Sequence, residues 1–302
     1  MPPNFRRDAF KGTAADYIRY RLPYPRAMLD DLLTRAAVPT AGARLLDLAC
    51  GPGRVAFAIM DHFTKIWAVD LEPEMVEAGR QEAVRRGVSQ IHWCVGPAET
   101  FEAPTGAFDL ITIGEAFHRL DQPRIAALAF GWLRRGGGFA TLGLQGLLEG
   151  DAPWRRALAE VVRRWIGSPA QSRPDMPPFT PARGTELLRS AGFIDVANHR
   201  FAFDHEWRLD ALLGNLRSTS VLSRRALGER AADFERDLAA TLLACEPAGR
   251  FRETINADYL LARRPDGRPS RPCSAHRGAK LSARRIGPVA ANSPGSADAI
   301  SR

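Results

Sequence analysis

The sequence has no long hydrophobic run and little cysteine. No apolar segment approaches the roughly 18 residues that a membrane span needs, and the N-terminal stretch MPPNFRRDAF carries charge without the apolar core of a signal peptide. We therefore expect a cytoplasmic protein without a membrane partner. The four cysteines, at positions 50, 94, 245 and 273, lie far apart and form no CxxC pair. This spacing disfavours a disulfide framework and a zinc site, so no metal is expected.

The basic charge is unevenly distributed. The formal net charge of the 302 residues is +8, but residues 265–302 contain seven Lys or Arg and two Asp, and so account for five of those charges. This stretch is also rich in Pro, Gly, Ser and Ala and nearly free of large apolar residues. It cannot bury enough surface to offset its ordering entropy, so we expect a disordered basic tail at 265–302. The body is too weakly basic to predict a specific nucleic-acid partner.

The most informative stretch is residues 44–60, RLLDLACGPGRVAFAIM. An apolar run containing Asp47 is followed by a turn with Gly51 and Gly53, and then by apolar residues at helical spacing. The pattern predicts a strand, a tight turn and a helix, the arrangement in which helix N–H groups face a bound nucleotide. The two glycines leave room for the ligand and permit a positive φ.

Acids and loops follow the next predicted strands. The strand Lys65–Asp70 ends in an acid, 17 residues after Gly53, whose carboxylate offers two acceptor oxygens for ribose hydroxyls. The alternative for Asp70 is a helix N-cap. Residues 91–95 predict a third strand, followed by GPAE, and residues 108–113 predict a fourth, followed by GEAFH.

These features resemble motif I and the following loops of the class I S-adenosylmethionine (SAM) dependent methyltransferases. Ala49 stands where the family usually has its first glycine. The resemblance implies that the loop backbone and the first acid hold the methionyl end of SAM, that the second acid binds ribose, and that the GPAE segment lies beside adenine. The implied cofactor-binding residues are Asp47, Ala49, Gly51, Gly53, Asp70, Leu71, Met75, Ala98, Glu99 and Glu115.

The segment after the fourth strand resembles a run common in methyltransferases of small acceptors, with Arg119 replacing the usual Trp. The resemblance places Glu115 and His118 near the transferred methyl group as candidate catalytic residues. A histidine there could act as a general base or orient the acceptor, because its ordinary pKa is near 6.5. The alternative is a histidine that is hydrogen-bonded under the sheet.

Residues 1–40 precede the first strand and contain YRLPYP, which resembles a stretch ahead of motif I in some small-molecule methyltransferases. We interpret this segment as a helical lid in which Tyr17, Tyr20 and Arg21 cover a ligand. The alternative is an N-terminal helix that packs on a sheet edge.

The alternation of strands and helices predicts a doubly wound α/β fold with right-handed crossovers. Further strands are expected at 139–144, 193–203 and 254–263, and helices at 122–133, 154–165, 185–191, 207–217 and 224–244. The resemblance implies a seven-stranded, mostly parallel sheet with an antiparallel edge strand, formed by residues 41–264. Segments of about 145–182 and 205–250 are expected to form helical caps over the acceptor.

The predicted function is transfer of a methyl group from SAM to a small-molecule acceptor by in-line displacement. The acceptor is an O-, N- or C-nucleophile, and the resemblance to trans-aconitate-type enzymes includes carboxylates. Such chemistry asks little of side chains beyond positioning and exclusion of water. Two alternatives stay open: an NAD(P)-dependent oxidoreductase, since Gly51-x-Gly53-x-x-Ala56 satisfies a relaxed dinucleotide pattern, and a SAM-binding protein without transfer. The sequence does not indicate an oligomeric state.

Overall fold

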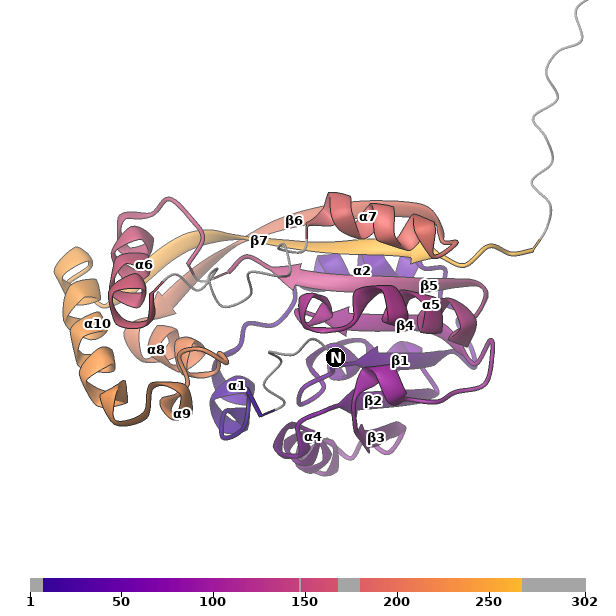
Figure 1. Ribbon diagram of the computed structural model, residues 1–302, viewed down its shortest axis with the longest axis horizontal. Coiled ribbons are helices and arrows are strands. Elements are labelled where there is room, and N and C mark those ends of the chain that lie inside the picture. Colours follow the sequence, from indigo (N-terminus) through magenta and orange to yellow (C-terminus); the bar gives the residue numbers. More distant parts are fainter. Residues whose placement is uncertain (1–7, 147, 168–179, 268–302) are drawn as a thin grey trace, which may run out of the picture. The chain divides into compact units, whose positions relative to one another are not determined.

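The computed structural model describes residues 8–146, 148–167 and 180–267. Its centre is a seven-stranded sheet in the order β3-β2-β1-β4-β5-β7-β6 (Figure 1). The strands are β1 (Arg44–Leu48), β2 (Lys65–Asp70), β3 (Ile91–Val95), β4 (Phe108–Gly114), β5 (Leu133–Leu144), β6 (Ile194–Arg208) and β7 (Arg250–Arg263). The first five pair in parallel, and β7 runs antiparallel to both of its neighbours, β5 and β6. The predicted fold class is confirmed, with the antiparallel strand lying one position in from the edge.

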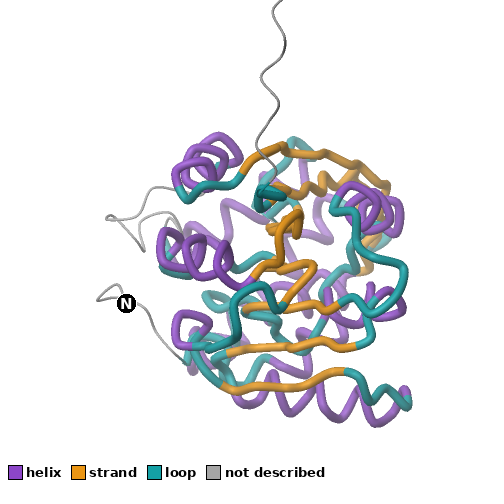
Figure 2. Tube along the Cα trace, turned by 90° about the vertical axis from the view of Figure 1, so that its right-hand side faces the viewer, coloured by secondary structure: helices purple, strands orange, loops and turns teal. Residues whose placement is uncertain are grey.

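Helices cover both faces of the sheet because β1, β2 and β4 are apolar on both faces (Figure 2). One face packs against α2 (Arg26–Arg35) and α3 (Arg54–Ile59), and α4 (Pro73–Arg86) lies along β2 and β3. The other face packs against α5 (Gln122–Trp132) and α7 (Pro181–Ser190). The carboxyl ends of the parallel strands are therefore left open for a site.

A third hydrophobic core lies at the far end of the β6–β7 ribbon. It is formed by α6 (Pro153–Ile166), α8 (Leu209–Arg217), α9 (Arg224–Leu227) and α10 (Ala231–Cys245), which we call the cap. The helix α1 (Ala14–Tyr20) packs against α8. The expected single helix at 224–244 is two helices, because Gly228 adopts a positive φ of 60° between them.

Three strands, β5, β6 and β7, are longer than predicted. The strand β5 was expected at 139–144 but begins at Leu133, so that residues 134–138, expected to end the preceding helix in a glycine-rich turn, belong to the strand, which pairs with β4. The β6–β7 ribbon also continues past residue 203: residues 204–208, partly assigned to a cap helix from 207, extend β6, and that helix begins at Leu209. Charged residues in this extension pair across the ribbon: Glu206 lies 2.5 Å from Arg250 and 2.7 Å from Arg252.

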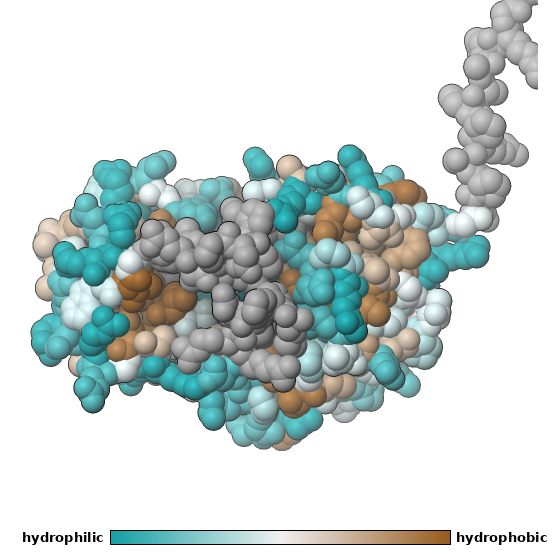
Figure 3. Space-filling view, in the orientation of Figure 1, coloured by the Kyte–Doolittle hydropathy of each residue, from teal (hydrophilic) through white to brown (hydrophobic). Residues whose placement is uncertain are grey.

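The chain divides into two units, Met1–Gly267 and Arg268–Arg302. The second unit, and with it most of the predicted basic tail, lies outside the described residues, as do residues 168–179 of the first predicted cap segment. Within the described ranges, no helix has both the length and the apolar character to cross a membrane. In Figure 3 hydrophilic residues cover much of the visible face, and hydrophobic groups lie at the cap on the left and in the region of α5 and α7 at the upper right.

Candidate functional site

The loop after β1 turns sharply at the carboxyl end of the sheet. Ala49, Gly51 and Gly53 have φ values of 50°, 57° and 88°, so all three are in the left-handed region. Gly53 also begins α3, and a Cβ added there would lie 2.6 Å from the ring of Trp93. The loop therefore requires glycine at position 53 on two grounds, and Ala49 holds a conformation that costs an L-residue about 1–2 kcal/mol.

Asp70 at the end of β2 fastens this loop. Its Oδ2 accepts a hydrogen bond from the N–H of Gly51 at 2.7 Å, and its Oδ1 accepts one from the N–H of Glu72 at 2.8 Å. Burial raises the pKa of Asp70, and these backbone bonds oppose the rise. A carboxylate has about four acceptor positions, so both oxygens keep capacity for a ligand.

Asp47 has a different place, beneath the loop. Its side chain is fully buried, and its two oxygens accept hydrogen bonds from the Thr112 hydroxyl at 2.8 Å and the Ala56 N–H at 3.2 Å. Burial raises the pKa of Asp47 to about 7. The residue joins β1, β4 and α3 and does not line a cavity among those described.

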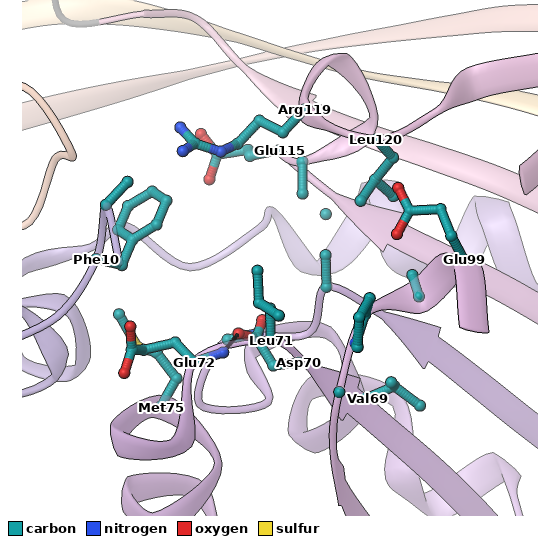
Figure 4. Close-up of a pocket in the computed structure, with 18 of the residues that line it drawn as sticks. Phe10, Val69, Asp70, Leu71, Glu72, Met75, Glu99, Glu115, Arg119 and Leu120 are labelled. Atoms are coloured by element: carbon teal, nitrogen blue, oxygen red, sulfur yellow. Dashed lines mark hydrogen bonds between the residues drawn. The ribbon is translucent and has the colours of Figure 1, made fainter. Parts of the chain in front are cut away.

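A cavity of about 910 Å3, including space open to solvent, lies beside the loop (Figure 4). We call it the loop cavity. Figure 4 shows Asp70, Leu71 and Glu72 on one side and Glu115 and Arg119 across from them. The lining residues are Ala9, Phe10, Tyr17, Ala49, Gly51, Val69, Asp70, Leu71, Glu72, Met75, Gly96, Pro97, Ala98, Glu99, Gly114, Glu115, Ala116, Arg119 and Leu120.

Eight of the residues implied as cofactor-binding line this cavity together: Ala49, Gly51, Asp70, Leu71, Met75, Ala98, Glu99 and Glu115. Asp47 and Gly53 do not line it. Among its described lining residues, four carboxylates (Asp70, Glu72, Glu99 and Glu115) face a single guanidinium, that of Arg119. The cavity is therefore acidic, which suits a cationic ligand and opposes a pyrophosphate.

The N-terminal segment closes one side of the loop cavity. Tyr17 lies against Gly51, whose added Cβ would meet the tyrosine ring at 3.8 Å. Phe10 packs edge-on against Tyr17 with ring centroids 6.2 Å apart, and the Arg119 guanidinium lies 4.8 Å above the Phe10 ring. Sequence reasoning missed Phe10. The available signal was an aromatic residue seven positions before Tyr17 in a segment already interpreted as a lid.

Tyr20, the third predicted lid residue besides Tyr17 and Arg21, points away from the loop cavity. Its ring covers Gly214 of α8, where an added Cβ would come within 2.2 Å, and its carbonyl accepts a hydrogen bond from Asn215 at 3.0 Å. Tyr20 therefore joins α1 to the cap.

Glu115 follows β4 and is held in an unusual conformation. Its φ is 51°, and its side chain lies 2.6 Å from Arg54 and 3.7 Å from Arg21. Burial alone would raise the pKa of Glu115, but Arg54 and Arg21 outweigh burial and hold that pKa below its ordinary value. The carboxylate is thus ionised and anchored, and it is a weak base.

His118, the other candidate catalytic residue, lies on the short helix η3 (Phe117–Arg119) and is exposed. It lines neither the loop cavity nor the second cavity described next, and its neighbours Arg119 and Leu120 line the loop cavity instead. A positive charge on His118 contributes to lowering the pKa of Glu115.

A second cavity of about 600 Å3, including space open to solvent, lies between the sheet and the cap, and we call it the cap cavity. It shares Glu115 with the loop cavity. The lining residues are Arg21, Leu22, Glu115, Leu144, Gln145, Gly146, Arg155, Trp207, Asn215, Thr219 and Ile255. Arg155 and Glu253 form a buried ion pair at this cavity, with side chains 2% and 6% exposed.

The described residues contain no cluster of His, Cys, Asp and Glu suited to hold a metal ion.

Comparison with known proteins agrees with this architecture. Residues 45–137 match the family model of a methyltransferase domain. An uncharacterized methyltransferase of Mycobacterium tuberculosis is 31% identical over 205 residues, covering 65% of this chain and 79% of the relative. A ubiquinone biosynthesis O-methyltransferase of Xanthomonas axonopodis is 30% identical over 193 residues, covering 62% of this chain and 77% of the relative.

Among solved structures, phosphoethanolamine N-methyltransferase 2 of Haemonchus contortus, in complex with phosphomonomethylethanolamine and S-adenosylhomocysteine, has a TM-score of 0.53. It is 16% identical, and the match covers 84% of this chain and 57% of that one, so it shows the shared fold. The narrower resemblance to trans-aconitate-type enzymes is not confirmed by these relatives. The sequence relatives and the fold together show that this chain belongs to the class I SAM-dependent methyltransferases.

Proposed function

We propose that the loop cavity binds SAM and that a small-molecule acceptor enters from the cap cavity. The observation that carries the proposal is the meeting of the two cavities at Glu115. A methyl donor on one side of this junction and an acceptor on the other would lie in line, and in-line approach within van der Waals reach is the main requirement of methyl transfer. The Haemonchus contortus enzyme, whose complex holds S-adenosylhomocysteine and a small acceptor, supports this assignment by analogy of fold.

The proposed roles follow the lining of the loop cavity. Asp70 accepts hydrogen bonds from the ribose hydroxyls, Leu71 and Met75 flank adenine, and Ala98 and Glu99 bond its edge. The backbone of the loop at Ala49 and Gly51 faces the methionyl end, and Asp47 supports that loop from below. Tyr17 and Phe10 form the lid over the cofactor, and Arg21 faces the acceptor side.

Glu115 then anchors Arg21 and Arg54 at the junction. We propose this positioning role in place of the general base considered from the sequence, because a carboxylate held by two guanidinium groups accepts a proton poorly. SAM carries the methyl group on a positively charged sulfur, and this sulfur leaves as a neutral thioether when the methyl group is transferred. The residues at the junction need only hold the reactants and exclude water.

The acidic lining argues against the nicotinamide alternative, because the two phosphates of a dinucleotide would face four carboxylates. Calorimetric titration with SAM, S-adenosylhomocysteine and NADH tests the assignment. We expect binding of the first two and none of NADH. Binding of NADH without SAM would contradict the proposal. Binding of SAM without transfer of labelled methyl to any small acceptor would favour a non-catalytic SAM-binding protein.

A further inference from the structure

The helix α1, which carries Tyr17, is fastened mainly to the cap. It lies between α8 and α4 (Figure 1), none of its residues is buried, and it packs more extensively against α8 than against α4. Three polar contacts join α1 and the residue after it to α8 and its C-terminal end: the Tyr20 carbonyl with Nδ2 of Asn215 at 3.0 Å, Nε of Arg21 with the Ser218 hydroxyl at 2.8 Å, and Asp16 with Arg217 at 3.5 Å. The position of α1 therefore depends on α8.

The ring of Tyr20 packs directly on the backbone of α8 at Gly214. A Cβ added at Gly214 would lie 2.2 Å from this ring, so any other residue at the position displaces the ring. Glycine within a helix costs about 1 kcal/mol of stability relative to alanine. The close approach of Tyr20 is a physical reason for a glycine inside α8. Gly214 itself lines neither the loop cavity nor the cap cavity.

A movement of Tyr20 reaches the loop cavity because Tyr17 precedes it by less than one turn on the same helix. Tyr17 lines the loop cavity and lies against Gly51, where an added Cβ would meet its ring at 3.8 Å. A helix as short as α1 is not stable on its own, so contacts with its neighbours set its position. Displacing the Tyr20 ring from Gly214 would therefore move Tyr17 away from the loop after β1.

We infer, resting on the proposed function, that Tyr20 and Gly214 are positioning residues for SAM. Neither residue contacts the cofactor. Together they hold Tyr17 against the loop after β1, so the cap determines how tightly the loop cavity binds SAM. Coupling between two parts of a molecule is reciprocal. A ligand in the loop cavity should therefore stabilise the packing of α1 on α8.

Calorimetric titration with S-adenosylhomocysteine tests the inference without an acceptor. We expect Gly214→Ala to weaken binding by about tenfold, because Tyr17 no longer closes the loop cavity. Tyr20→Ala should have a similar effect, whereas Tyr20→Phe keeps the ring and should bind like the unmodified protein. Unchanged affinity in both Gly214→Ala and Tyr20→Ala overturns the inference.

The matched control is Gly131→Ala. It also replaces a glycine within a helix, α5, but an added Cβ there meets nothing within 4 Å. This variant should bind S-adenosylhomocysteine like the unmodified protein. A loss as large as that of Gly214→Ala would come from any helical glycine, and the assignment to the contact with Tyr20 would be wrong.

Combined substitutions separate positioning from a loss of structure in the cap. In a protein that already carries Tyr17→Ala, Gly214→Ala should change the affinity by less than about twofold, because the side chain through which it acts is absent. A loss as large as in the unmodified background would show that the effect does not pass through Tyr17, and would overturn the inference. If Gly214→Ala does not fold, Tyr20→Ala takes its place in this comparison, since it removes atoms and adds none.

Amide exchange tests the reverse direction of the coupling. Saturating S-adenosylhomocysteine should slow amide exchange in α8 of the unmodified protein but not in Tyr20→Ala, where α1 no longer packs on Gly214. Equal protection of α8 in the two proteins contradicts the inference and leaves the proposed function standing. Failure of S-adenosylhomocysteine to bind to the unmodified protein would overturn the proposed function itself.

Discussion

Asp47 and Asp70 lie near the ends of the neighbouring strands β1 and β2, and the resemblance implied that both bind the cofactor. Asp47 is buried beneath the loop and bonds Thr112 and Ala56, whereas Asp70 fastens Gly51 and also lines the loop cavity. The difference follows from direction along the strand, because only the last residue of a strand reaches the open end of the sheet. At the residue scale, therefore, we propose Asp70 as the ligand-binding acid, because it lines the loop cavity, whereas Asp47 supports the loop from below.

Replacing Asp70 by Asn should weaken SAM binding by about 1.5–3 kcal/mol, because charge-assisted bonds to the ribose hydroxyls become neutral or are lost. S-adenosylhomocysteine should lose a similar amount, since it has the same ribose. Calorimetry measures both. Unchanged affinity for both ligands would contradict the ribose assignment.

Two controls separate the ribose bonds from the support that Asp70 gives to the loop. The first control is an analogue of S-adenosylhomocysteine that lacks the ribose 2′-hydroxyl. The unmodified protein should bind this analogue more weakly than S-adenosylhomocysteine. The Asp70→Asn variant should bind the two ligands with nearly equal affinity. Asp61→Asn, at an exposed position on the short helix η1 (Met60–His62), should bind like the unmodified protein.

The buried Asp47 should make stability depend on pH. Its pKa in the folded protein is about 7, above the ordinary value of an aspartate, so the folded state holds this proton more tightly. The contribution of Asp47 to stability is full below pH 4 and is lost as the pH rises to about 7. Relative to Asp47→Asn, which cannot titrate, the unmodified protein should lose on the order of 3 kcal/mol across that window.

Denaturant unfolding of the two proteins at intervals from pH 4 to 8 measures this difference. Asn can retain both local bonds, accepting from the Ala56 N–H and donating to the Thr112 hydroxyl. Parallel curves of unfolding free energy against pH would show that Asp47 does not titrate in this range, and the account of its burial would then be wrong.

At the scale of elements, the N-terminal segment connects α4, beside the loop cavity, to the cap. The N–H of Gly12 bonds Glu74 of α4 at 2.6 Å, and Asp8 forms an ion pair with Arg225 of α9. Between these anchors, Phe10 lies over the loop cavity. The segment must give way for a ligand to enter, and its contacts should slow the ligand's release.

Phe10→Ala should raise the dissociation rate of SAM by roughly tenfold, because the removed ring covers the loop cavity and leaves part of the ligand in water. Stopped-flow displacement measures the rate directly. Ile18→Ala is the control, because Ile18 lies on α1 but is 41% exposed and does not line the loop cavity. Equal dissociation rates for the Phe10 variant and the unmodified protein would show that the segment is not a lid.

The cap is held to the sheet by a buried polar group. Glu253 of β7 pairs with Arg155 of α6 and accepts a hydrogen bond from the Trp207 indole at 2.5 Å. Glu253→Gln should lower the free energy of unfolding by about 2–4 kcal/mol, because Arg155 is left as an uncompensated buried charge. Amide exchange in α6 should accelerate as well.

Glu229→Gln is the matched control for that substitution, since Glu229 is exposed on the short helix η5 (Gly228–Arg230). It should change the free energy of unfolding by less than about 0.5 kcal/mol. If the two variants are equally stable, the Arg155–Glu253 pair does not hold the cap in place.

At the scale of the whole molecule, the sequence predicted correctly those strands whose bounds depend only on neighbouring residues. The strands β2 and β3 begin and end as expected, because each is a short apolar run closed by polar or turn residues. The extended ribbon was underestimated, since Glu206 is paired with Arg250 and Arg252 from a distant strand and nothing local shows it. The cap cavity was missed for the same reason: Arg21, Arg155 and Trp207 come from three separate segments.

The grouping of candidate site residues was predictable where they belong to short sequence motifs at the ends of strands. Gly51, Asp70 and Ala98 gather as expected because they lie at or just after the carboxyl ends of adjacent parallel strands. The orientation of single side chains was not predictable, as His118 shows: it follows the right strand but is exposed, while Arg119 beside it lines the loop cavity.

The most direct test of the whole account is a crystal structure of the protein with S-adenosylhomocysteine. We predict the nucleoside in the loop cavity, with its ribose on Asp70 and the sulfur facing Glu115. A nucleoside bound outside the loop cavity would contradict the central claim.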